Sequence, residues 1–226
     1  MEHTVEHRPS YAQLELELVR GETVRSEAGA MVSHAGGVDV DTKAEGGVLE
    51  SLSRSLFGGE SFFLNTFSAT EDTTLRLAPA LSGDVQHHEL HDETLYVQST
   101  SFLASDTGIE VDTSFGGAKT FFGGEGLVLL ELTGTGPAFL SSYGAIDPVT
   151  VEPGETAVVD TGHIVAFEET LDFDVQRVGG LKSTLFSGEG LVCEFSGHGT
   201  VWTQTRSPDA FLSWLIPKLP TQSGQR

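Results

Sequence analysis

One motif, a Gly-Glu pair that opens an apolar run, occurs three times in this chain and restricts the folds available to it. The three stretches read SLFGGESFFLNTFSAT, TFFGGEGLVLLELTGTG and TLFSGEGLVCEFSGHG. Their shared glutamates, Glu60, Glu125 and Glu189, recur with a period of about 65 residues. A chain that repeats one motif three times is expected to build three similar structural units rather than one irregular fold.

Two further marks recur in each copy in the same order. A Glu-Thr pair is followed nine residues later by an apolar pair, and an Asp comes ten residues after that. The Glu, the first apolar residue and the Asp of the three copies are Glu22, Met31 and Asp41; Glu93, Phe102 and Asp112; and Glu155, Ile164 and Asp174. Matched offsets at three places indicate that the repetition extends through the whole unit.

The residues inside each copy alternate in the manner of β-strands. The segments Val38–Asp41, Ile109–Asp112 and Leu171–Asp174 alternate apolar and acidic residues with a period of two. That pattern is typical of a strand with one buried and one solvent-facing side. The run LELEL from Leu14 has the same character.

A turn signal lies at one equivalent position of each copy, between two extended runs. The pairs are Arg-Gly at 20–21, His-Asp at 91–92 and Pro-Gly at 153–154. Because Pro presets φ and Gly accepts a positive φ, we predict a tight hairpin at each position.

These features predict an all-β fold. A unit made of short strands cannot bury both faces of its sheet alone, whereas three units around an axis can cover one another and leave few free edges. We therefore predict a single domain of three pseudo-threefold β repeats, β-prism-like, over residues 11–220. The repeats lie at about 11–82, 83–143 and 144–206.

Two segments have helical patterns. The link 41–59 is longer than its counterparts and spaces apolar residues by three or four, which predicts a short amphipathic helix. Near the end of the chain, Ser207 is placed to cap a helix, Pro208 suits its first position and Pro217 ends the apolar stripe. We predict a short C-terminal helix over 207–216, which either packs on the body or offers a surface to a membrane or partner.

The charge of the chain limits its partners and its setting. Twelve basic and 33 acidic residues give a net charge of −21. Such a surface repels polyanions, so we predict no nucleic-acid binding. Self-repulsion of this kind is screened within about 3 Å at 1 M salt, which favours a halophilic source. The opening MEHTVEHRPS has no features of a signal peptide, and we expect a cytoplasmic protein.

Over about residues 11–220, the chain resembles the family of the mitochondrial protein altered inheritance of mitochondria twenty-four. The stretches that carry the resemblance are GGESFFLNTFSA, TGTGPAFLSSYG and RVGGLKSTLFSGEGLVCEFSGHGTVWTQTRS, with the closing helix. The resemblance implies a β-prism-like fold of three repeats, distantly similar to the tryptophan RNA-binding attenuation protein. It also implies a role like that of the mitochondrial branch in inner-membrane organisation, and it implies no catalytic or binding residues.

Two features are weak signals of chemistry. The stretch VGGLKST, from Val178, is not a phosphate-binding loop, because Leu181 stands where such a loop requires glycine. Cys193, the single cysteine, occupies the position of Leu64 and Leu129 in the other copies. We therefore predict a buried and inert thiol.

The densest group of metal-ligand residues is QHHELHDE. His87, Glu89 and His91 would share one face of a strand, which is a plausible start for a metal site. The turn residues found at the position of His91 in the other copies favour a solvated turn instead.

The paired acids of the predicted strands are Asp39 and Asp41, Glu110 and Asp112, and Asp172 and Asp174. Neighbours in such pairs lie about 7 Å apart, so we predict a solvated acidic face without a shared ion.

The three shared glutamates are the positions that we single out. Threefold symmetry would place Glu60, Glu125 and Glu189 at equivalent points, as axial or interface positions. Each carboxylate can instead accept hydrogen bonds from the backbone of its own turn, and both interpretations stay open. The sequence predicts no catalytic residue, no cofactor and no metal.

Without a catalytic pattern, we expect a non-catalytic scaffold or assembly protein and not an enzyme. Rotational repetition produces repeated faces, which suit a homo-oligomer, a protein partner or a peripheral membrane contact. The alternative is a small-molecule binding module with a pocket between repeats, whose ligand the sequence does not specify.

Overall fold

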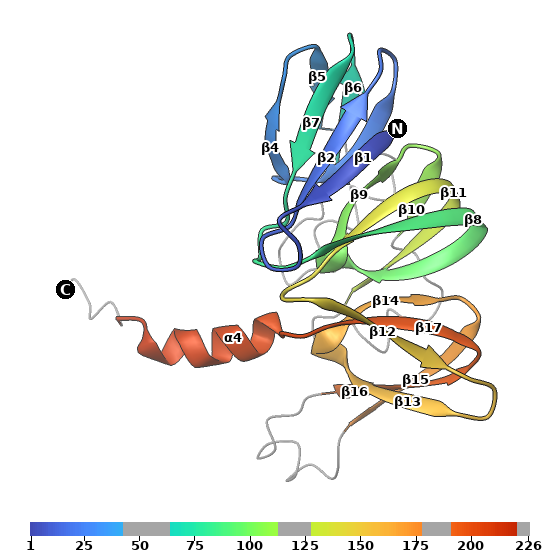
Figure 1. The fold of residues 1–226 in the computed structure, drawn as a ribbon. Coiled ribbons are helices and arrows are strands. Elements are labelled where there is room, and N and C mark those ends of the chain that lie inside the picture. Colours follow the sequence, from blue (N-terminus) through green and yellow to red (C-terminus); the bar gives the residue numbers. More distant parts are fainter. Residues whose placement is uncertain (43–63, 113–127, 178–190, 221–226) are drawn as a thin grey trace.

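The computed structural model describes residues 1–42, 64–112, 128–177 and 191–220. The described residues are mostly β-strands, with one short α-helix near the C-terminus, and the strands form several antiparallel sheets (Figure 1). In Figure 1 the chain runs from a blue block of strands through a green and yellow one to an orange one. In the described part, no helix has the length and apolar character needed to cross a membrane.

The first part of the chain makes one sheet of its own and one edge of a larger sheet. Strands β1, β2, β7 and β4 form a four-stranded sheet in that order, while β3, β6 and β5 belong to a ten-stranded sheet. The strands are β1 (Glu2–Glu6), β2 (Gln13–Leu18), β3 (Thr23–Glu27), β4 (Met31–His34), β5 (Val38–Asp41), β6 (Leu64–Ala69) and β7 (Thr73–Leu77).

The middle of the chain provides the centre of the ten-stranded sheet. The long strands β8 and β11 pair antiparallel over their whole lengths, with a register shift between Gly134 and Thr135. Strand β9 joins β11 to β3 of the first part, and β10 pairs with the other end of β11. The elements are β8 (Val85–Gln98), η1 (Ser99–Ser101), β9 (Phe102–Asp106), β10 (Ile109–Asp112) and β11 (Leu129–Ser141).

The last part repeats the division between two sheets. Strands β12, β17 and β14 extend the ten-stranded sheet through the pairing of β14 with β8, whereas β13, β16 and β15 form a three-stranded sheet. The elements are β12 (Ile146–Val151), β13 (Thr156–Asp160), η2 (Thr161–His163), β14 (Ile164–Glu168), β15 (Leu171–Arg177), β16 (Leu191–Gly197) and β17 (Gly199–Gln204), followed by α4 (Pro208–Leu215) and η3 (Ile216–Lys218).

Three clusters of buried apolar side chains form the core, and each draws mainly on one of the predicted repeats. Representative members are Leu14, Phe67 and Leu75 in the first cluster, Leu90, Leu132 and Leu140 in the second, and Phe167, Cys193 and Phe195 in the third. The third is rich in aromatic contacts, since the ring of Phe167 lies 5.1 Å from those of both Phe173 and Phe195. Burial of these side chains supplies most of the driving force for folding.

The marks read from the sequence coincide with strand boundaries. Met31, Phe102 and Ile164 are the first residues of β4, β9 and β14. The alternating segments that we predicted as strands are β5, β10 and the start of β15, which confirms all three. Their solvent-facing side is also confirmed in β10 and β15, whereas in β5 both acids and Val40 are exposed.

The three predicted hairpins are wrong. A positive φ does occur at each position, 93° at Gly21, 64° at Asp92 and 89° at Gly154. The strands that flank the first turn do not pair with each other, because β2 pairs with β1 and β7 while β3 pairs with β6 and β9. The same holds at the third turn, where β12 pairs with β17 and β13 pairs with β16. The turns therefore pass the chain from one sheet to another. At Asp92 the chain continues as one long strand, opposite the register shift in β11.

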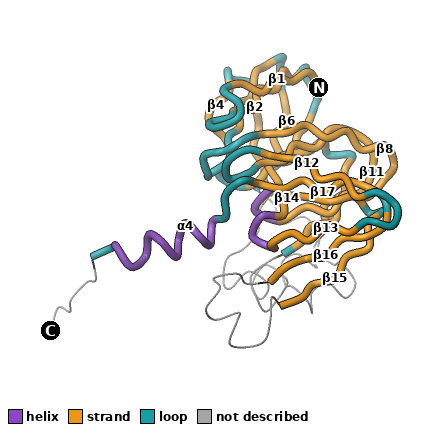
Figure 2. Tube along the Cα trace, turned by 60° about the horizontal axis from the view of Figure 1, so that its bottom comes forward, coloured by secondary structure: helices purple, strands orange, loops and turns teal. Residues whose placement is uncertain are grey.

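The C-terminal helix is confirmed to within one residue at each end. The side chain of Ser207 accepts a hydrogen bond from the backbone N–H of Ala210, and Pro208 is the first helical residue. Its position is not that of a core helix, because none of its residues is buried and it projects away from the strands (Figures 1 and 2). The second predicted helix, at 41–59, lies almost entirely outside the described residues.

Candidate functional site

The boundaries between the predicted repeats meet at one point in the structure. Gly83 and Gly144, each at the start of a repeat, form a parallel bridge although they are far apart in sequence. The backbone N–H of Asp84 donates to the carbonyl of Gly144 at 2.9 Å, and that of Ser142 donates to the carbonyl of Asp84 at 3.1 Å. We call residues 82–84, 142–145 and 204–206 the junction.

The end of the last repeat completes the junction. The N–H of Thr205 donates to the carbonyl of Ala145 at 3.1 Å, and that of Arg206 donates to the carbonyl of Tyr143 at 3.2 Å. The side chain of Gln204 accepts from the N–H of Tyr143 at 2.8 Å. The segment that leads into α4 is thus fixed to the boundary between the first two repeats.

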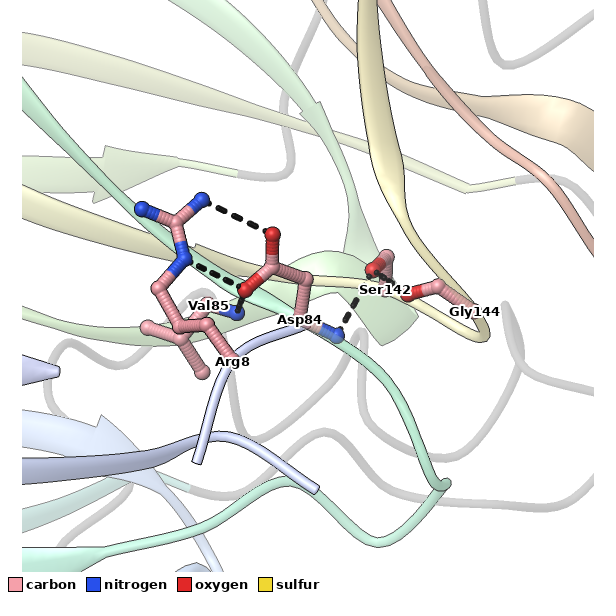
Figure 3. Close-up of polar contacts among 5 residues, drawn as sticks. All are labelled: Arg8, Asp84, Val85, Ser142 and Gly144. Carbon is pink, nitrogen blue, oxygen red and sulfur yellow. Dashed lines mark hydrogen bonds and ion pairs between the residues drawn. The ribbon is translucent and has the colours of Figure 1, made fainter. Parts of the chain in front are cut away.

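An ion pair ties the N-terminal segment to the junction (Figure 3). Arg8 donates to both carboxylate oxygens of Asp84, with Nε 2.7 Å from Oδ1 and Nη2 2.8 Å from Oδ2. The Asp84 side chain is 4% exposed and also accepts from the N–H of Val85, so its charge is satisfied. The hydrogen bond that Arg8 donates to the Asp84 carboxylate raises the pKa of Arg8. This arrangement has the geometry of a structural clasp.

A small cavity opens beside the junction. Its volume is about 160 Å³, and all three predicted repeats and the first residue of α4 contribute to its wall. The lining residues are Glu27, Pro79, Ala80, Leu81, Thr100, Ser141, Ser142, Tyr143, Gln204 and Pro208. The mixture of apolar surface, hydroxyl groups and one carboxylate is that of a site for a small polar or cationic group.

Glu27 is the chemically distinctive group in this cavity. It ends β3, which pairs on both sides with β6 and β9, so the backbone holds it in place. Within the described residues its carboxylate has no hydrogen-bond or ion-pair partner, and burial raises its pKa to about 7. Because a desolvated carboxylate is stabilised by an opposite charge, the position suits a cation.

The C-terminal helix starts at the rim of the same cavity. Pro208 lines the cavity, and the ring of Phe211 lies 6.0 Å from that of Tyr143, another lining residue. Beyond this contact, apolar side chains of α4 and η3 face solvent, with 46% of Leu212, 58% of Trp214 and 60% of Ile216 exposed. An apolar helix that its own body leaves uncovered is typical of an interaction surface.

A larger and more open hollow lies against the first sheet. It has a volume of about 490 Å³ and is lined by Glu17, Glu22 and Asp72 among others. The N-terminal ammonium already pairs with Glu22 at 3.0 Å, and Arg20 donates its backbone N–H to Asp72. Since these carboxylates have partners, we place the candidate site at the junction cavity.

The histidine group does not form the solvated turn that we predicted. His87, Glu89 and His91 all lie within β8, where His87 Nε2 and Glu89 Oε2 are 3.1 Å apart. The ring of His3 lies 4.4 Å from that of His87, and burial lowers the pKa of His3. In the part of the chain that the structure describes, no three His, Cys, Asp or Glu side chains are arranged to hold a metal ion.

His88 belongs to the opposite side of β8. Its ring packs edge-on against Trp202 at 5.1 Å, and burial lowers its pKa. The nearest acid, Glu93, lies 3.7 Å from its Nε2. The histidines of this segment therefore divide between two faces and do not converge on one point.

Other predicted positions have mixed outcomes. Cys193 is buried, as we predicted, and burial raises the pKa of its thiol to about 12. The acids of the paired strands are exposed or partly exposed at Asp39, Asp41, Glu110, Asp112, Asp172 and Asp174. The glutamates Glu60, Glu125 and Glu189 and the VGGLKST stretch lie outside the described residues, so their roles stay predictions.

Sequence reasoning missed both parts of the junction site. Arg8 lies before the region that we assigned to the domain, and its pairing with Asp84 spans 76 residues. The glycines at the repeat boundaries, Gly83 and Gly144, were the one available signal of a close approach. Glu27 ends an ordinary polar-apolar strand, and no local pattern distinguishes it from an exposed acid.

Comparison with known proteins shows the same architecture in bacteria. The family described as Mitochondrial biogenesis AIM24 matches residues 3–206 and ends just before α4. An uncharacterized protein of Streptococcus pyogenes serotype M6 is 29% identical over 99% of this chain and 93% of its own length. A crystal structure of a Streptococcus pyogenes protein, from a structural genomics consortium, aligns with a TM-score of 0.81 at 28% identity, covering 96% of this chain and 99% of that one.

Proposed function

Because the chain belongs to the Mitochondrial biogenesis AIM24 family, whose similar bacterial proteins carry no assigned activity, we propose that it is a non-catalytic scaffold that assembles through α4. The observation that carries the proposal is the exposure of the apolar side chains of α4 beside a well-packed β body. Solvent exposure of such a surface is unfavourable, and association would remove it from water.

The buried polar groups favour a non-catalytic role. The Asp84 carboxylate accepts hydrogen bonds from Arg8 and from the backbone N–H of Val85, which is a structural use of a carboxylate. His88 packs against Trp202, and Cys193 has a thiol whose pKa lies far from neutrality. None of these groups has the paired nucleophile and base that covalent catalysis needs.

The occupant that we favour for α4 is a second copy of the chain. Residues 206–226 contain three basic residues and one acidic residue, whereas the whole chain has a net charge of −21. The tail is thus attracted to an acidic body of its own kind, while that body is repelled by anionic lipid. A homo-oligomer follows from the charge distribution more directly than a membrane contact does.

Light scattering coupled to size exclusion tests this proposal. We expect the wild type to exceed the monomer mass at low and molar salt, and Leu212→Ser with Trp214→Ser to give a monomer. Loss of two partly exposed side chains from each copy removes roughly 4 kcal/mol, or about a thousandfold in affinity. The matched control is Val158→Ser, because Val158 is also exposed, at 62%, but lies on β13.

Two results would reject the proposal. A wild-type protein that is monomeric at both salt concentrations has no self-assembly to explain. If the wild type floats with anionic vesicles and the variant with Leu212→Ser and Trp214→Ser does not, α4 binds a lipid surface instead.

The second candidate function is a small-molecule binding module with its pocket between repeats. It is favoured by one observation: Glu27 lines the junction cavity, and its carboxylate has no partner among the described residues. Native mass spectrometry of the purified protein tests it, because a retained ligand would add a discrete mass that Glu27→Gln removes.

The pseudo-threefold, β-prism-like relation among the repeats is part of the same proposal. It is supported by the positive φ at equivalent positions Gly21, Asp92 and Gly154, and by the meeting of the repeat boundaries at the junction. The ten-stranded sheet contains strands of all three repeats, so neighbouring repeats are joined by strand pairing at their edges. Superposition of the three repeats in a crystal structure of this chain would test it.

A further inference from the structure

We propose that two copies pair through antiparallel α4 helices, so that Lys218 of each copy enters the junction cavity of the other and pairs with Glu27. This inference rests on the proposed assembly through α4. It adds the symmetry of the dimer, the register of the helices and the residue pair that makes the contact specific.

The apolar stripe of α4 leads directly into the cavity. Pro208, Phe211 and Leu215 follow one another at intervals of three or four residues, so they lie along one side of the helix. The first of them lines the cavity, and the second contacts Tyr143 in the cavity wall. A partner that covers the stripe therefore also covers the mouth of the cavity.

A twofold axis through the middle of the helix gives the register. Residues 208–218 span about 15 Å, and in an antiparallel pair centred near Ser213 the last residue of one helix lies beside the first of the other. Lys218 of the second copy then lies next to Pro208, at the rim of the cavity. Because the contact is isologous, the same pairing forms twice.

Among the residues that the structure describes, neither of the two charged groups pairs with an opposite charge. Within the described residues, Glu27 has no partner for its carboxylate. Lys218 is the one lysine in the described part, and its Nζ contacts only the carbonyl oxygen of Trp214 at 3.1 Å and the Trp214 ring at 4.6 Å. Its flexible four-carbon stem can swing from the ring into a narrow cavity. Pairing would give the Glu27 carboxylate and the Lys218 ammonium the opposite charge that each lacks among the described residues.

The cavity also fits this occupant in size and chemistry. A volume of about 160 Å³ accepts one long side chain rather than a large ligand. The hydroxyl groups of Thr100, Ser141 and Tyr143 line the wall and can accept the remaining ammonium hydrogens. Leu81 and Pro79 offer apolar surface to the carbon stem of the lysine.

A charge exchange in the full chain tests the pairing. The dimer dissociation constant is measured by sedimentation at fixed salt for Glu27→Lys, for Lys218→Glu and for the double exchange. We expect each single variant to weaken the dimer at least tenfold and the double variant to return to within about threefold of the wild type. Glu27→Gln keeps the shape of the side chain and should also weaken the dimer, even where Glu27→Lys fails to fold.

The matched control is Glu155→Lys, which makes the same change of charge at an exposed turn. It should leave the dimer intact, because it reduces overall repulsion and touches neither helix nor cavity. If Leu212→Ser with Trp214→Ser abolishes the dimer while Glu27→Gln and the exchange variants leave it unchanged, assembly through α4 stands and the Lys218–Glu27 pairing is wrong. A monomeric wild type refutes both. A retained small cation that Glu27→Gln removes assigns the cavity to a ligand and refutes the pairing alone.

Discussion

Replacement of Gly83 by alanine should be strongly destabilising, because Gly83 is buried where the repeat boundaries meet. A Cβ atom at this position would overlap the carbonyl oxygen of Ser142 and lie 2.7 Å from the carbonyl carbon of Ser142. It would also lie 2.9 Å from the carbonyl oxygen of Gly144. All of these are backbone atoms, so no side chain can rotate away. The φ of Gly83 is not in the left-handed region, and the cost is therefore steric rather than conformational.

The size of the effect follows from the contacts that must open. The Gly83–Gly144 bridge is flanked by three backbone hydrogen bonds: Asp84 to Gly144 at 2.9 Å, Ser142 to Asp84 at 3.1 Å and Gly144 to Ser82 at 3.0 Å. Each contributes about 1 kcal/mol, and more when a buried partner is left unsatisfied. We expect Gly83→Ala to lower the free energy of unfolding by about 3 to 5 kcal/mol.

Gly154 provides a matched control for the same substitution. Its φ is 89°, and a Cβ atom there would meet no atom within 4 Å. Gly154→Ala therefore carries only the penalty of a left-handed backbone, about 1 to 2 kcal/mol. The two variants separate close packing from backbone conformation with one chemical change.

Guanidinium chloride unfolding, followed by far-ultraviolet circular dichroism and by tryptophan fluorescence, measures both variants. The slope of the transition should stay constant, so that the midpoint reports stability alone. If Gly83→Ala costs no more than Gly154→Ala, the repeat boundaries are not in close contact and the junction that we describe is wrong.

Three further predictions concern the core and the cavity. Leu191→Ala should lower the free energy of unfolding by about 2 to 5 kcal/mol, because Leu191 is 8% exposed. Asp172→Asn on the solvent-facing side of β15 should change stability little, and equal effects of the two substitutions in denaturant unfolding would contradict the burial pattern. In the single chain Glu27 has a pKa of about 7 against 4.5 for a free glutamate, so the monomeric variant with Leu212→Ser and Trp214→Ser should lose up to about 3 kcal/mol of stability as pH rises from 4.5 to 7. Adding Glu27→Gln to that variant should remove this loss. Urea unfolding at pH 5 and pH 8 compares the two proteins, and an equal loss in both would refute the desolvated carboxylate. The Cys193 thiol, with a pKa of about 12 and no exposed surface, should react with a disulfide reagent at pH 8 only after unfolding, and fast reaction of the native protein would place it elsewhere.

Local sequence determined the strands and the helix. Alternation along Ile109–Asp112 and Leu171–Asp174 was sufficient, because a strand with one buried side needs a period of two whatever its partner is. The cap formed by Ser207 and the proline at 208 placed the start of α4, since both act within one turn of the helix. The recurrence of a core position identified Cys193 as buried. The strands and the helix start depend on neighbours in the sequence, and the burial of Cys193 was read from the repeat.

The tertiary structure alone decided which strands pair and what they enclose. A turn at Gly21 is compatible with a hairpin or with a passage between sheets, because the backbone angles are local while the partner of each strand edge is not. The burial of Glu27 and the clasp of Arg8 on Asp84 arise where segments distant in the sequence meet. The exposure of α4 has the same origin, because its amphipathic pattern fits a core helix and a docking helix equally, and only the position of the body shows which side it leaves open.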